Sequence, residues 1–176
     1  SNHGLEVLAF RHPSAGCQFV KGTIEEGELP RDAASRELFE ESGLICPVEM
    51  AALGTMDVGP ERTTWHFFIW GSTGLPERWE HSTEDDGGHT FAFFWHPIGV
   101  PLDEDWHPIF REAFQFAVVI SIIDDRFWRI AAKAAFGPKR SFAQFPHDLH
   151  NTLFDRQKGG IYAQIGYPSL IVPVLD

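Results

Sequence analysis

Short runs of apolar residues, separated by turns rich in glycine and proline, recur along the first two thirds of the chain. In one of them Trp65, Phe67 and Ile69 alternate with their neighbours, which is the period of a strand with one buried face. Runs of this kind predict five β-strands, at residues 5–10, 17–20, 48–56, 63–70 and 89–96. The polar stretch 71–88 predicts a long loop, and loops of that length are commonly functional or mobile.

Helical spacing of side chains occurs in two places before residue 120. The pattern changes to helical from Arg31 to Ser42, and Gly43 follows where a helix end commonly needs a left-handed residue. A second helix is expected to begin near Asp105, with apolar residues at Ile109, Phe110, Ala113, Phe114 and Ala117. Strands interleaved with helices in this order predict an α/β layered sandwich with a mixed sheet.

The part of the chain after about residue 120 carries no chemical motif. Helical patterns occur at 126–136 and 147–157, and strand-like runs broken by prolines lie in 161–175. A unit of this size is only marginally stable alone. We therefore expect residues 1–120 to form one domain. Residues 121–176 should pack on that domain or form a contact in a homodimer, and they should supply no catalytic group.

The charge of the chain narrows the classes of partner. The 176 residues carry a net charge of −11, with 7 basic and 20 acidic residues in 1–120 but 7 basic and 5 acidic residues in 121–176. This balance argues against general binding to nucleic acid, because such binding needs a basic surface. An anionic substrate that approaches the acidic first domain would need metal ions beside it.

Cysteine content and hydropathy indicate the compartment. Cys17 and Cys46 are too few for a disulfide framework. No apolar run reaches the ~18–20 residues needed to cross a membrane, and no basic and apolar leader opens the chain. We therefore expect a cytoplasmic protein that does not bind membranes.

The candidate chemistry lies between residues 22 and 44, which read GTIEEGELPRDAASRELFEESGL. In a helix, Glu37, Glu40 and Glu41 are three or four residues apart and share one face. Like charges at those spacings disfavour a bare helix by ~0.2–0.5 kcal/mol per pair, so the cluster favours a compensating cation. Mg²⁺ suits carboxylate oxygens and keeps room for substrate phosphates. The alternative, a solvated acidic helix face, accounts for any one of these glutamates but not for the whole spaced pattern.

Residues outside the helix complete this motif. Arg36 can hold Glu28 by a bidentate pair, which would tie the preceding loop to the helix. Gly22 and Gly27 permit backbone geometry closed to other residues, so the loop can bring a carbonyl oxygen up to a metal.

The spaced residues resemble the Nudix box at each of its defined positions: Gly22, Glu28, Arg36, Glu37, Leu38, Glu40, Glu41, Gly43 and Leu44. Seven exact identities at this spacing would coincide by chance roughly 10⁻⁹ times per starting point. The resemblance implies a Nudix-type α/β/α sandwich over residues 1–120. It also implies a hydrolase of acid anhydrides that cleaves a diphosphate linkage in a nucleoside diphosphate derivative or related organic pyrophosphate. Members of the family often carry a strand before the first apolar run, and the resemblance leaves open whether such a strand is missing here or is replaced by the C-terminal segment.

The resemblance further implies roles for single residues. Mg²⁺, or Mn²⁺ in its place, would be bound by Glu37, Glu40, Glu41 and the carbonyl of Gly22. One of these glutamates or a carboxylate of the later loop would act as general base, with Arg36 and Glu28 in the catalytic set. The candidates in the later loop are Glu84, Asp85 and Asp86.

Only two basic residues, Arg11 and Lys21, are candidates for binding the substrate. Arg11 ends the first predicted strand, where the family often places a basic residue near a small-molecule diphosphate substrate. Lys21 resembles the Lys-Gly of members that act on highly phosphorylated substrates, although a solvent-facing loop lysine explains it equally well. The strand histidines His66, His89 and His96 are interpreted as structural or exposed.

Other functions remain as alternatives. One is an RNA-end or dinucleoside polyphosphate pyrophosphohydrolase, of which the RNA-end activity is disfavoured by the acidic first domain. Another is a non-catalytic Nudix-like domain that binds a nucleotide or a protein, disfavoured because every glutamate of the box is present.

Overall fold

The computed structural model describes residues 6–47, 49–72, 74–83, 88–123 and 169–176. Its helices are α1 (Pro30–Ser42) and α2 (Pro108–Ile123). Its strands are β1 (Glu6–His12), β2 (Gly16–Phe19), β3 (Gly22–Thr23), β4 (Ala51–Val58), β5 (Thr63–Gly71), β6 (Arg78–Ser82), β7 (Thr90–Pro97) and β8 (Ser169–Leu175).

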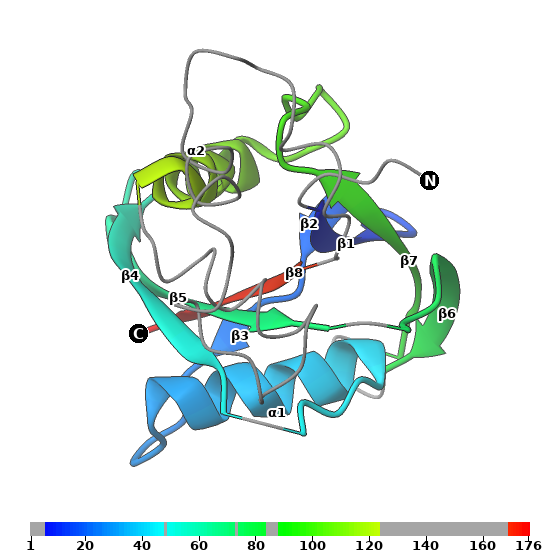
Figure 1. Cartoon of the computed structure of the whole chain (residues 1–176), viewed down its shortest axis with the longest axis horizontal. Coiled ribbons are helices and arrows are strands. Elements are labelled where there is room, and N and C mark those ends of the chain that lie inside the picture. Colours follow the sequence, from blue (N-terminus) through cyan, green and yellow to red (C-terminus); the bar gives the residue numbers. More distant parts are fainter. Residues whose placement is uncertain (1–5, 48, 73, 84–87, 124–168) are drawn as a thin grey trace, which may run out of the picture.

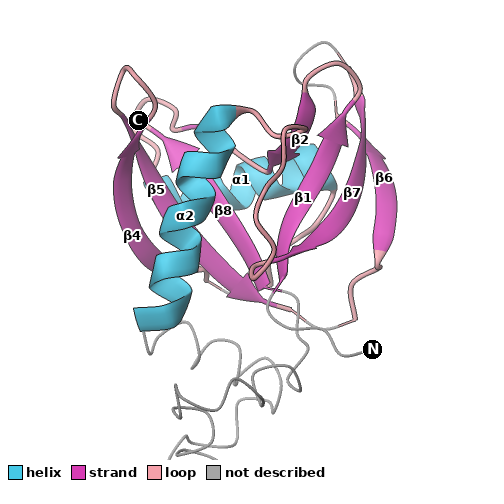
Figure 2. Cartoon of the chain, turned by 90° about the horizontal axis from the view of Figure 1, so that it is seen from above, coloured by secondary structure: helices cyan, strands magenta, loops and turns pink. Residues whose placement is uncertain are grey.

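The strands form two four-stranded sheets. Sheet A has the order β2-β1-β7-β6 and is antiparallel throughout. Sheet B has the order β3-β8-β5-β4 and is mixed, because β3 and β8 run parallel while its other pairs are antiparallel. The two sheets meet where β1 lies beside β8, and the helices α1 and α2 cover opposite faces of the strands (Figures 1 and 2). The predicted α/β/α sandwich is confirmed.

Each helix has its own apolar core against the strands. Along β1, Val7 and Ala9 join the core beneath α2, whereas Leu8 and Phe10 join the core beneath α1. Successive side chains of a strand point to opposite faces, so one strand serves both cores. The α1 core holds Ala33, Ala34 and Leu38 of the helix, with side chains of both sheets.

The helix α1 begins and ends where the sequence predicts. Pro30 stands at its first turn, where the missing amide hydrogen costs no helical hydrogen bond. Gly43 ends it with φ 73°, and the Gly43 amide donates to the Phe39 carbonyl oxygen at 2.8 Å. This left-handed conformation favours glycine, and the helix predicted over 31–42 is confirmed.

The loop prediction for 71–88 is wrong in part, because the edge strand β6 lies inside it. Trp79 of β6 stacks on Phe93 of β7 with ring centroids 4.9 Å apart and donates its indole N–H to the Ser42 carbonyl oxygen at 3.0 Å. A strand with one large apolar residue has no visible alternation in sequence. Its partners, α1 and β7, become evident only in the folded chain. Glu84, Asp85 and Asp86 lie outside the described residues.

Strand β8 occupies an interior position in sheet B, between β3 and β5. It comes from the range 121–176, which the sequence predicts to be a separate C-terminal segment packed on the first domain or in a dimer contact. Val172 and Val174 are fully buried in the core beneath α1. Proline has no amide hydrogen to donate, which usually excludes it from an interior strand. Pro173 is tolerated here because β3 pairs only with Val174 and Leu175, so no hydrogen bond from residue 173 to β3 is lost. The helical patterns at 126–136 and 147–157 fall outside the described residues.

Candidate active site

Arg36 forms a bidentate ion pair with Glu28, as the sequence predicts. Its Nε donates to Glu28 Oε1 at 3.0 Å and its Nη2 donates to Glu28 Oε2 at 2.9 Å. Nη2 also donates to the Thr23 carbonyl oxygen at 2.9 Å. Because Glu28 belongs to the loop and Arg36 to α1, these bonds fasten the loop between β3 and α1 onto the helix. The hydrogen bonds from Arg36 lower the pKa of the Glu28 carboxyl and raise the pKa of the guanidinium.

The same guanidinium reaches two carboxylates of the helix. Arg36 Nη1 donates to Glu37 Oε1 at 2.8 Å and to Glu40 Oε2 at 2.9 Å. Glu37 is buried, with 9% of its surface exposed. Burial of a carboxylate is costly unless it is paired, and Arg36 supplies that pairing here. Arg36 therefore gathers three carboxylates around one cation.

The backbone around Gly22 lies against these carboxylates. A Cβ atom placed on Gly22 would lie 1.7 Å from the Glu37 Cδ atom, so no side chain fits there without displacing the glutamate. The Lys21 amide donates to Glu41 Oε2 at 3.2 Å. The motif needs glycine at position 22 because of this close approach between β3 and α1.

The donor set suits a hard divalent cation, since carboxylate oxygens and a backbone carbonyl are the ligands such ions prefer. The space that a Cβ of Gly22 would fill is occupied by the Glu37 carboxylate, which brings the acidic cluster and the strand backbone together. As they stand, no three acidic, histidine or cysteine side chains in the described part of the chain converge to hold a metal. Arg36 Nη1 bridges Glu37 and Glu40, so these two side chains would have to turn from the guanidinium to bind one.

The two basic residues predicted to bind substrate lie in different surroundings. Arg11 shares the strand face of Val7 and Ala9, which is the α2 side, and its Nη2 donates to Asp105 Oδ2 at 3.1 Å. The structure therefore does not bring Arg11 into the cluster around Arg36. Lys21 is half-buried and adjoins the cluster through its amide.

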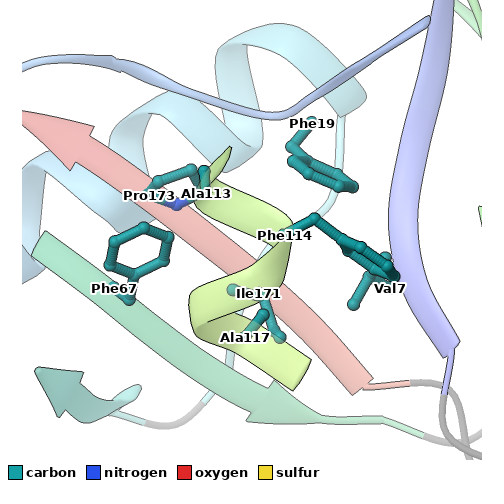
Figure 3. Close-up of a pocket in the computed structure, with 8 residues that line it drawn as sticks. All are labelled: Val7, Phe19, Phe67, Ala113, Phe114, Ala117, Ile171 and Pro173. Atoms are coloured by element: carbon teal, nitrogen blue, oxygen red, sulfur yellow. The ribbon is translucent and has the colours of Figure 1, made fainter. Parts of the chain in front are cut away.

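A small cavity lies elsewhere in the molecule, between α2 and the two sheets (Figure 3). Its volume of about 10 Å³ is at the lower limit of the space that can hold one water molecule. Apolar side chains such as Val7, Phe114 and Ile171 line it. Because this cavity is too small for a substrate and is lined by apolar side chains, we interpret it as an imperfection in core packing and not as a substrate site.

One polar pair in sheet B was not predicted from the sequence. His66 Nε2 lies 3.0 Å from Asp176 Oδ1, and the two residues are 110 positions apart. No local pattern could have joined them, because their proximity depends on the pairing of β5 with β8.

Comparison with known proteins identifies the family of the chain. The chain matches the NUDIX domain over residues 2–115, which is more than half of its length. The protein belongs to the Nudix family. No solved structure matches it.

Curated relatives match a shorter stretch. Over 44 residues the chain is 48% identical to the RNA pyrophosphohydrolase of Vibrio atlanticus (strain LGP32). Over a stretch of the same length it is 46% identical to the RNA pyrophosphohydrolases of Vibrio vulnificus strains YJ016 and CMCP6. The aligned part is 25% of this chain and 26% of each relative, so the chain spans about a quarter of the length of these proteins. None of the helices that the structure describes is long and apolar enough to cross a membrane.

Proposed function

We propose that this protein is a Mg²⁺-dependent pyrophosphohydrolase that cleaves a diphosphate linkage in a nucleoside diphosphate derivative or a related organic pyrophosphate. The observation that carries the proposal is the group of glutamates on one face of α1, joined by Arg36 and pressed against the backbone of Gly22. Membership of the Nudix family supports hydrolysis of this class of bond. Mn²⁺ is the alternative cation.

Each residue of the cluster has an assigned role in this proposal. Glu40 and Glu41 would hold the cation, together with the carbonyl oxygen of Gly22. Glu37 either joins them or accepts the proton of the attacking water. Bound Mg²⁺ would neutralise the diphosphate and offset the charge that builds on its bridging oxygen.

The reaction forms one bond and breaks one. The oxygen of water bonds to one phosphorus atom, and its proton passes to a site carboxylate. The bond from that phosphorus to the bridging oxygen breaks, and the electron pair leaves with the second phosphate. Because a diphosphate repels an anionic nucleophile, electrostatic neutralisation at the site should supply much of the acceleration.

A hydrolysis screen tests the proposal. Sugar nucleotides, dinucleoside polyphosphates, nucleoside triphosphates and 5′-triphosphorylated RNA would each be incubated with Mg²⁺ and, separately, with a chelator. We expect phosphate-containing products from at least one class, only when the metal is present. Absence of metal-dependent turnover across all four classes would leave a binding domain as the better description.

One observation favours a second candidate within this screen. The short segment that is 48% identical to an RNA pyrophosphohydrolase supports activity on RNA 5′ ends. The excess of acidic residues in 1–120 opposes it, since RNA binding needs basic contacts to phosphates. Faster turnover of triphosphorylated RNA than of free nucleoside triphosphate would favour this candidate.

The variant Gly22→Ala is expected to lower turnover roughly 10²-fold, the cost of misplacing a reacting group by about 1 Å. The added Cβ would displace the Glu37 carboxylate from the strand backbone. Measurement of kcat on the best substrate of the screen tests this, with thermal unfolding to verify folding. Gly99→Ala is the matched control, because a Cβ at Gly99 meets no atom within 4 Å. Equal turnover in both variants would contradict the prediction.

The variant Glu28→Gln is expected to lower kcat less than the loss of a carboxylate that holds the cation, because Glu28 only positions the loop through Arg36.

The Glu28→Gln variant should also change how stability depends on pH. The pKa of Glu28 in the folded protein lies below its ordinary value, because Arg36 donates hydrogen bonds to the carboxylate. The pair therefore stabilises the fold at neutral pH, and this contribution is lost as the pH falls below about 4. Between about pH 6 and 3 the variant should therefore lose less stability than the wild type, because it has no carboxylate to protonate at this position. Unfolding midpoints measured across that range would test it, and parallel curves would contradict it.

A further inference from the structure

Two rows of residues cross sheet B on the side that faces α1. In the first row Gly22 pairs with Val174, Val174 with His66, and His66 with Thr55. Directly paired residues of a sheet point to the same face. Val174 belongs to the core beneath α1, and a Cβ on Gly22 would reach Glu37 of that helix. His66 therefore points to the side of the sheet on which the carboxylate cluster lies.

The second row consists of Asp176, Thr64 and Asp57, and it holds the His66 side chain in place. The Asp176 amide donates to the Thr64 carbonyl oxygen at 3.1 Å, and the Thr64 hydroxyl donates to Asp57 Oδ1 at 3.0 Å. Asp176 Oδ1 lies 3.0 Å from His66 Nε2. The His66 side chain is 23% exposed. Asp176 is thus fixed by its backbone, and it fixes one nitrogen of the imidazole.

The distance from His66 to the cluster suits an extended anionic ligand. Gly22 and His66 are separated by two strand spacings, or about 10 Å. Within these two rows, as far as the structure describes them, His66 is the only side chain that can carry a positive charge, and the nearby cation Arg62 is paired with Asp57 at 3.0 Å. Glutamates crowd the site at one end of the span and aspartates flank the other, so a phosphate here needs a cationic or hydrogen-bonding partner.

We propose that His66 forms a phosphate-binding subsite for the phosphate of the substrate that is farther from the Glu37, Glu40 and Glu41 carboxylates, with Asp176 as its positioning residue. This subsite rests on the proposed function. With Nε2 held by Asp176, a hydrogen on Nδ1 would be donated to a phosphate oxygen of the bound substrate. Among described residues, none is hydrogen-bonded to His66 Nδ1.

Binding of methylenediphosphonate in the presence of Mg²⁺, measured by calorimetry, tests the subsite without requiring a known substrate. We expect His66→Gln to bind roughly 10- to 100-fold more weakly than wild type, the usual cost of one hydrogen bond to a charged group. His66→Arg should recover part of the affinity, because it restores a cationic donor. Asp176→Asn should weaken binding less than His66→Gln, because the histidine is kept and only its orientation is loosened.

The control is His107→Gln, which removes an exposed histidine at the start of α2, away from sheet B's α1 side. It should bind like wild type, and all variants should unfold at temperatures close to wild type. If wild type binds and His66→Gln binds equally well, the subsite is refuted and the proposed function stands. If wild type neither binds the diphosphonate nor cleaves any member of the substrate screen, both proposals fall. If His66→Arg stays as weak as His66→Gln while folded, a phosphate contact by His66 is also refuted.

Discussion

Replacing Glu40 by Gln will lower kcat roughly 10²–10⁴-fold, the range usual for removing an acid–base or electrostatic group. Glutamine keeps the size of the side chain and can still accept the hydrogen bond from Arg36 Nη1. It removes the negative charge that the proposed cation needs. The Glu40 side chain is 35% exposed, so the neutral amide should cost little folding stability.

The measurement is kcat with Mg²⁺ on the best substrate of the screen, together with the thermal unfolding midpoint. The exposed residue Glu26 in the preceding loop gives a matched control, because Glu26→Gln removes the same charge at a position that is not one of the defined positions of the Nudix box. Near-normal turnover by Glu40→Gln would show that the site does not lie on α1. A large fall for both variants would indicate that general loss of negative charge, and not position, matters.

Ending the chain at residue 168 will unfold the protein, because this removes strand β8 from the interior of sheet B. The deletion exposes the partners of Ile171, Val172 and Val174, all of which are buried. Each such side chain contributes about 1.5–3 kcal/mol on burial. Three of them amount to about 5–9 kcal/mol, a large part of the roughly 5–15 kcal/mol that stabilises a typical domain. Both neighbouring strands would also lose their hydrogen-bonding partner.

Circular dichroism and thermal unfolding would measure this effect. Removal of Asp176 alone is the matched control for the unfolding measurement only, since it shortens the chain but leaves β8 in place; turnover is not compared in this control, because Asp176 is the proposed positioning residue of His66. A chain ending at residue 168 that still unfolds cooperatively and retains turnover would contradict the prediction. Truncation at about residue 120 removes β8 as well. The expectation that 121–176 holds no catalytic group is therefore better tested by substitutions, and it stays a prediction, as does the domain boundary.

The local part of the site followed from the sequence because its residues lie within 23 positions of one another. Helical periodicity alone places Glu37, Glu40 and Glu41 on one face, and the Arg36 pair with Glu28 was found as predicted. The ends of α1 followed from Pro30 and Gly43, whose backbone preferences are properties of the residues themselves.

Only the tertiary structure decided the rest, because strand pairing joins residues that are distant in sequence. It placed β8 between β3 and β5, and it gave β6 the partners that make a strand of a polar stretch. It also turned Arg11 to the α2 side, where Asp105 holds it, and set His66 against Asp176. Sequence patterns specify which face of an element is apolar. Which distant strand covers that face depends on how all the apolar faces are buried together.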